Sequence, residues 1–123
     1  MDGELTPISF SEKFSNFSEQ WSPKVIAEMN DYQFKLVRIE GEFVWHEHAN
    51  TDETFIVLEG SIAIDFEDAT VELEAGQLLV VPRGVMHRPR ADSEAKVLLV
   101  EPRGVINTGR ADSALTAPID RWI

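Results

Sequence analysis

Short apolar runs separated by turn-forming residues fill most of the chain from Lys24 onward. Pairs such as Asn30-Asp31, Glu59-Gly60 and Arg83-Gly84 interrupt the runs every few residues, which leaves no room for helices that would connect parallel strands. Many short strands at close spacing are typical of an antiparallel sandwich or barrel. We therefore predict an all-β fold with strands at 25–29, 34–39, 43–48, 54–58, 62–66, 71–73, 78–81, 85–89 and 96–100.

The first part of the chain follows a different pattern. Between residues 6 and 21, apolar side chains from Ile8 to Trp21 recur every three or four positions, which predicts a short amphipathic helix. Ser9 and Glu12 have the spacing of a helix-capping box.

The segment after the predicted strands, residues 102–123, shows no sustained period. It ends in Trp122 and Ile123, two large apolar residues that we expect to dock against protein. An arm packed over its own barrel and a contact with a partner subunit both fit this ending. We treat residues 1–123 as one domain with a barrel core at about 24–101.

The charge and composition of the chain exclude several kinds of partner and site. There are 22 acidic residues against 11 Lys plus Arg, a formal net charge of -11 at pH 7, which disfavours nucleic acid and anionic membranes as partners. The first residues lack the basic and apolar regions of a signal peptide, so we expect a cytoplasmic protein. Since the chain has no cysteine, a metal site would have to use His, Asp and Glu.

All three histidines fall between residues 46 and 87. His46 and His48 are two positions apart, so in an extended segment their side chains point to the same face while Glu47 points away. Glu53 follows after a turn-rich stretch, which would place it beside the histidine pair, and a closed barrel could bring His87 across. Three imidazoles and one carboxylate can hold a divalent first-row metal ion with positions left for water or substrate.

The spacing of these residues resembles the two motifs of the cupin superfamily. The first motif comprises His46, His48, Glu53 and Gly60, and the second comprises Gly76, Pro82, Gly84 and His87. Two positions depart from the usual pattern: four rather than five residues separate Gly41 from His46, and Ala91 stands where asparagine is often found. The likeness extends over about residues 24–101, and the small members described as mannose-6-phosphate-isomerase-like are the most similar in character.

The resemblance implies a double-stranded β-helix, the jelly-roll barrel, with a metal ion held inside it by His46, His48, Glu53 and His87. This ligand set suits iron, manganese, nickel, zinc or copper. Counting in twos from the ligands predicts an apolar pocket wall formed by Val44, Phe55, Val57 and Val85.

Two arginines, Arg38 and Arg83, are candidates for binding a carboxylate or phosphate of a small ligand at the barrel mouth. Alternation turns Arg88 and Arg90 away from the pocket. The alternative for all four is that they balance nearby carboxylates at the surface.

Three functions fit this sequence. The first is a metal-dependent enzyme acting on a small organic molecule, of the oxygenase, isomerase or lyase type. The second is a non-catalytic module that binds or senses a small ligand, and the third is a protein whose metal only stabilises the barrel. The run from Thr54 to Leu58 is apolar on both faces, which favours burial against a second subunit and predicts a homodimer.

Overall fold

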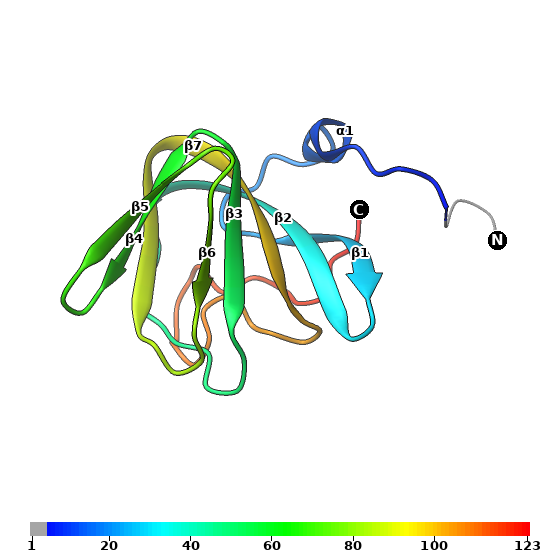
Figure 1. The fold of residues 1–123 in the computed structure, drawn as a ribbon. Helices are drawn as coiled ribbons and strands as arrows, with labels where there is room; N and C mark the ends of the chain where they lie inside the picture. Colours follow the sequence, from blue (N-terminus) through cyan, green and yellow to red (C-terminus); the bar gives the residue numbers. More distant parts are fainter. Residues whose placement is uncertain (1–4) are drawn as a thin grey trace.

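The computed structural model describes residues 5–123 of the chain. Within this range the chain forms one short helix and seven strands (Figure 1). The elements are α1 (Phe10–Phe14), β1 (Lys24–Met29), β2 (Tyr32–Glu42), β3 (Glu53–Glu59), β4 (Ser61–Phe66), β5 (Thr70–Glu74), β6 (Leu78–Val81) and β7 (His87–Pro102).

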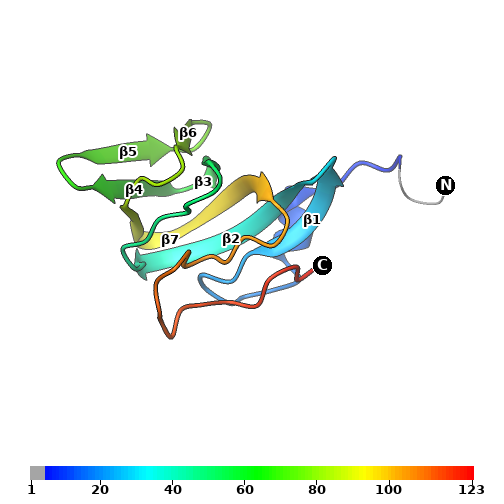
Figure 2. The same cartoon turned by 90° about the horizontal axis from the view of Figure 1, so that it is seen from below.

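The longest strand, β7, organises the sheet. One edge of β7 pairs with β2 along almost its whole length, from Tyr32↔Pro102 to Glu42↔Arg90. The other edge pairs first with β4 and then with β3. All strand pairs are antiparallel, with β5 beside β4, β6 beside β3 and β1 beside β2. The sheet therefore splits where β4 and β3 diverge. The pairs β4–β5 and β3–β6 form one layer, which lies over the layer of β7, β2 and β1 (Figure 2).

The space between these layers is filled by the inward faces of the strands. Alternate residues such as Val37 and Ile39 on β2, Val57 on β3 and Val97 on β7 are each at most 4% exposed. This antiparallel jelly-roll arrangement confirms the predicted all-β class.

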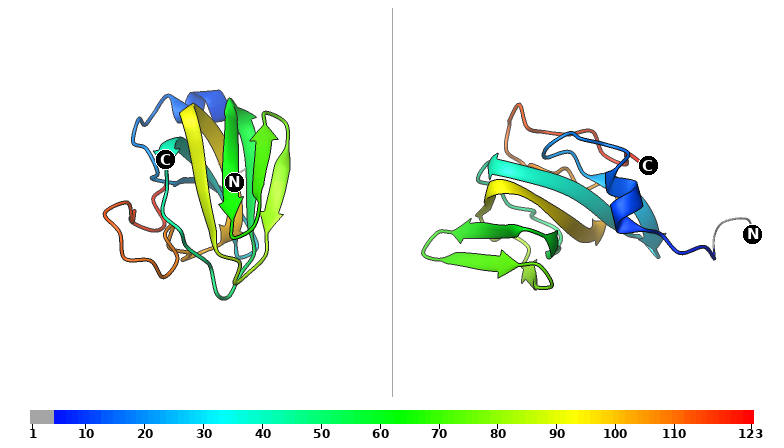
Figure 3. Two further views of the ribbon diagram at one scale, coloured as in Figure 1. Left: turned by 90° about the vertical axis from the view of Figure 1, so that its left-hand side faces the viewer. Right: turned by 90° about the horizontal axis from the view of Figure 1, so that it is seen from above.

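A second apolar cluster covers the outer face of the sheet. Phe14 and Phe17 pack there against Ile26, Leu36 and Leu98, and α1 lies above that face (Figure 3). Burial of the N-terminal phenylalanines on one side of the sheet holds this segment in place.

The predicted helix over residues 6–21 was too long, because α1 has five residues. Its N-cap is as predicted, since the Ser9 hydroxyl accepts a hydrogen bond from the Glu12 amide at 3.2 Å. Phe14 and Phe17 pack outside the sheet, whereas Trp21 enters the core between the layers. One face of a helix cannot pack on both the outer cluster and the inner core, so the helix ends at Phe14 and the chain crosses from the outer face of the sheet to the core. No helix in residues 5–123 is long and apolar enough to span a membrane.

Two features of the strand pattern also differ from the prediction. Residues 43–48 belong to no named strand; they contact β7 through an isolated bridge between His46 and His87 and a hydrogen bond from the Phe43 amide to the Pro89 carbonyl. The predicted strands 85–89 and 96–100 are joined in β7, which continues through Asp92 and Ser93, where the prediction places a break between two strands. The small buried residues Ala91 and Ala95 lie on this stretch, where β7 leaves β4 and joins β3.

Candidate metal centre

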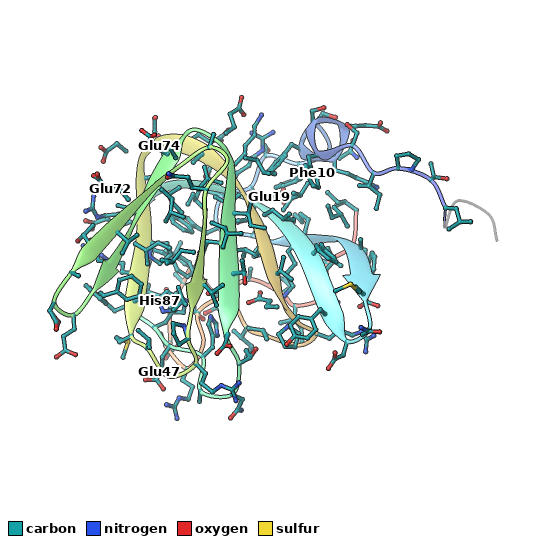
Figure 4. All side chains as sticks on the ribbon, in the orientation of Figure 1. Phe10, Glu19, Glu47, Glu72, Glu74 and His87 are labelled. Carbon is teal, nitrogen blue, oxygen red and sulfur yellow. The ribbon has the colours of Figure 1, made fainter. Side chains whose placement is uncertain are left out.

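Four buried side chains from two separate parts of the sequence meet inside the barrel. His46 and His48 come from the connection between β2 and β3, Glu53 begins β3, and His87 begins β7. Each offers one ligand atom, and these atoms all lie within 4.8 Å of one another. The four residues are between 1% and 6% exposed, and Figure 4 shows His87 enclosed by the strands. This separation is close to that of ligands each about 2 Å from one ion.

The backbone fixes the first and second motifs against each other. The His46 amide donates to the His87 carbonyl at 3.0 Å, and the His87 amide donates to the His46 carbonyl at 2.9 Å. The Gly84 amide donates to the His48 carbonyl at 2.8 Å. The turn that precedes His87 is therefore attached to the histidine pair by main-chain hydrogen bonds.

Hydrogen bonds at Nδ1 orient two of the imidazoles. His46 Nδ1 lies 2.9 Å from the Val44 carbonyl, and His87 Nδ1 lies 2.8 Å from the Val85 carbonyl. Because a carbonyl can only accept, Nδ1 carries the hydrogen in both rings and Nε2 presents a lone pair. This is the usual arrangement of a metal-binding histidine whose second nitrogen is anchored.

Two of the imidazoles lie beside the Glu53 carboxylate. Nε2 of His48 and Nε2 of His87 each lie 3.4 Å from Glu53 Oε1. His48 Nε2 is buried and has no hydrogen-bond partner among residues 5–123. Burial acts to raise the pKa of Glu53, but the neighbouring His48 and His87 outweigh it and hold that pKa well below its usual range. Three imidazoles and an ionised carboxylate, each with one ligand atom in the same small buried space, form the donor set of a divalent ion, so the residues present fit such an ion.

Burial and then the neighbouring His87 lower the pKa of His46 to about 4, against 6.5 for a free imidazole. We therefore expect His46 of the metal-free protein to titrate at about pH 4 when its imidazole resonances are followed by NMR. The neutral ring contributes fully to folding above pH 6.5, and this contribution, at most ~3 kcal/mol, is lost as the pH falls towards 4. A midpoint near 6.5, with the resonance assigned by His46→Gln, would contradict the expectation.

Two hollows adjoin the site. An inner cavity of about 30 Å³ is lined mainly by apolar side chains together with His46 and Glu53, and it has room for about two water molecules. An outer groove of about 380 Å³ is lined by His48, by the loop that follows it and by residues 102–106, 109 and 110. Water-sized ligands thus fit inside the barrel, whereas the groove on the His48 side has room for a small organic molecule.

The predicted pocket residues take several places around the ligands. Phe55 lines the inner cavity together with residues that the alternation did not indicate, namely Trp21, Phe43 and Asn107. Val57 is fully buried in the core. Val44 and Val85 pack against the same core, and their carbonyls anchor the imidazoles as described above.

The structure does not place the two candidate anion-binding arginines at the cavity. Arg38 lies on the outer face of β2, where its guanidinium donates to the Phe14 and Phe17 carbonyls and pairs with Glu94. Arg83 is exposed and pairs with Asp52. Arg38 thus has its partners on the outer face of the sheet, whereas Arg83 pairs with the residue that precedes Glu53 and does not line the inner cavity.

Sequence reasoning missed a buried ion pair beside the site. Lys35 Nζ lies 3.0 Å from Glu101 Oε2, with both side chains at most 5% exposed. Burial and the adjacent Glu53 charge raise the pKa of Glu101, and Lys35 only partly opposes them. Their inward positions on β2 and β7 follow from the same two-residue alternation as Val37 and Val97, so this periodicity could have indicated them.

The fold and the site together define a class of protein, namely jelly-roll barrels with a buried three-histidine, one-carboxylate centre. The comparison with known families agrees with this class, because the cupin domain family matches residues 35–101. The chain therefore belongs to the cupin family.

Several known proteins are similar to this chain. A cupin-2 domain protein of Shewanella frigidimarina is 60% identical with a TM-score of 0.77, and the match covers 78% of this chain and 94% of that one. Protein NMB1881 of Neisseria meningitidis is 31% identical with a TM-score of 0.72, covering 78% and 98%. The uncharacterised protein YdbB of Bacillus subtilis is 44% identical over 81 residues, which are 65% of this chain and 66% of that protein, slightly under two thirds.

A larger protein shares only the fold. Hydroquinone 1,2-dioxygenase of Sphingomonas sp. TTNP3 is 22% identical with a TM-score of 0.73, and the match covers 80% of this chain and 33% of that one. At this identity the likeness carries the architecture and not the activity.

Proposed function

We propose that this protein is a metal-dependent enzyme that acts on a small organic molecule beside a divalent ion held by His46, His48, Glu53 and His87. The observation that carries the proposal is the convergence of four buried ligand atoms within 4.8 Å of one another, with His48 Nε2 left without a hydrogen-bond partner among residues 5–123. A bound ion would act as a Lewis acid or activate a water molecule. Four protein ligands leave one or two coordination positions for substrate.

The remaining residues support this chemistry by position. The carbonyls of Val44 and Val85 hold two imidazoles in the tautomer that binds metal. Phe43 and Phe55 line the cavity and lower the dielectric around the ligands, which strengthens electrostatic interactions. The outer groove at His48 supplies the approach for a substrate. Oxygenase, isomerase and lyase reactions all fit these features.

The test combines elemental analysis with a substrate panel. Protein purified without an affinity tag is expected to contain a divalent first-row metal and to convert a member of a panel of keto acids, catechols and sugar phosphates. His48→Ala should abolish the conversion. A panel member that raises the melting temperature without being consumed would instead indicate a binding module. If metal removal lowers stability and none of the panel binds, the metal only stabilises the barrel.

We also propose a cytoplasmic homodimer. The outer face of β3 and β6 presents Leu78 and Val80, which are 59% and 48% exposed, beside the partly buried Ile56. Burial of this row against a second copy would remove apolar surface from water. We expect a dimer by sedimentation equilibrium and a monomer for Val80→Lys. A wild-type protein that is monomeric at all concentrations would contradict this.

A further inference from the structure

The C-terminal arm, residues 103–123, packs directly on the segment that carries His46 and His48. A Cβ atom added to Gly109 would lie 2.0 Å from the Glu47 carbonyl oxygen and 3.0 Å from the Glu47 carbonyl carbon. This carbonyl belongs to the peptide that joins Glu47 to His48. Arg110 forms an ion pair with the Glu47 carboxylate, and Figure 4 shows Glu47 at the rim of the barrel, away from the enclosed His87.

The arm is folded and attached to the barrel by its own hydrogen bonds. Thr108 is fully buried, and its hydroxyl lies 2.6 Å from that of Thr116. The Asn107 side-chain amide donates to the carbonyl of Trp21 at 3.0 Å, and Trp21 belongs to the barrel core. The side-chain oxygen of Asn107 accepts a hydrogen bond from the Ala117 amide at 2.9 Å. These hydrogen bonds hold the arm, and with it Gly109, in a fixed position on the barrel.

The segment carrying the ligands lies outside the strand ladders. The bridge between His46 and His87 and the hydrogen bond from the Gly84 amide to the His48 carbonyl attach it to the second motif. The arm adds a contact between these two attachments, at the peptide that joins Glu47 to His48. We propose that the arm, through Gly109, holds the His46–His48 segment in the geometry that binds a divalent ion, so that arm docking and metal binding stabilise each other. This rests on the metal site of the proposed function, and it makes Gly109 a positioning residue.

A matched pair of substitutions tests the proposal with Co²⁺ as the probe. Gly109 and Gly104 both have positive φ, 59° and 79°, so alanine costs backbone strain at either position. A Cβ at Gly104 meets nothing within 4 Å. We expect Gly109→Ala to weaken Co²⁺ binding about 10- to 100-fold, as loss of a supporting partner does, and to change the absorption spectrum of bound Co²⁺. Gly104→Ala should leave both unchanged.

A second measurement uses the unaltered protein, so it does not depend on the folding of a variant. Coupling between two sites is reciprocal, so Co²⁺ should slow hydrogen exchange of the Gly109 and Ala111 amides, which donate to the Ile106 and Thr108 carbonyls at 2.9 and 3.0 Å. Unchanged exchange together with normal Co²⁺ binding by Gly109→Ala would overturn the positioning role alone. Failure of the wild-type protein to bind Co²⁺ would overturn the metal site and the positioning role together.

Discussion

Replacing His87 by alanine is expected to remove divalent-metal binding. The substitution keeps both main-chain hydrogen bonds to His46 and removes only the imidazole that faces Glu53 at 3.4 Å. Since loss of an outer partner already weakens metal binding about 10- to 100-fold, loss of a ligand should weaken it by at least about 100-fold. Isothermal titration calorimetry with Zn²⁺ or Co²⁺ measures this directly.

The effect of metal on thermal stability, compared between the wild-type protein and its variants, tests the same expectation and allows a control. Metal at about 100 times the wild-type Kd should stabilise the wild-type protein by ~2.7 kcal/mol and His87→Ala by at most ~0.4 kcal/mol. Glu47→Gln is the matched control, because Glu47 lies between two ligands in the sequence but pairs with Arg110 at the surface. We expect Glu47→Gln to keep the metal-induced shift. Equal shifts in the wild-type protein and His87→Ala would show that the metal binds elsewhere.

The second large effect is expected for Leu36→Ala, with a loss of about 3–5 kcal/mol in the free energy of unfolding. Leu36 is fully buried between Phe14, Phe17 and Leu98 on the outer face of the sheet. A shorter side chain leaves a cavity there that the strand backbones cannot close. Denaturant unfolding monitored by circular dichroism measures the change, which is a large fraction of the total stability of an ordinary domain.

Leu5→Ala is the control for this prediction, since Leu5 is 85% exposed and should change stability by at most about 0.5 kcal/mol. Leu36 faces away from the metal ligands, so the folded Leu36→Ala protein should bind metal as the wild type does. Similar stability of the two variants would mean that the N-terminal phenylalanines do not contribute a core.

The strand pattern could be predicted because turns and alternation are local properties of the sequence. Asn30-Asp31 and Glu59-Gly60 separate the strands where expected. What could not be predicted was set by contacts at long range. The continuity of β7 through Asp92 depends on its pairing with β2 on one edge and with two successive strands on the other. The early end of α1 likewise depends on Trp21 entering a core that forms elsewhere.

The four candidate ligands could be predicted because their spacing is a motif. The supporting groups have no such signal. Alternation indicates that Phe55 faces inward, but the sequence does not show that Asn107 reaches the cavity from the arm. Nor does it show that Gly109 lies on the Glu47 peptide. The assignment of Arg38 to the barrel mouth was wrong. Its partners are the Phe14 and Phe17 carbonyls, which become available only because α1 ends early, and the sequence does not show this.

The bridge between His46 and His87 has a consequence for the folding kinetics. These residues are separated in the sequence by β3, β4, β5 and β6, so the bridge closes a long loop. Contacts between residues this far apart in the sequence slow the folding of β proteins. A chain in which β7 has not docked lacks the assembled cluster, so an ion held by these four residues would be bound only after β7 has docked. Acquisition of the ion would then mark the completion of folding.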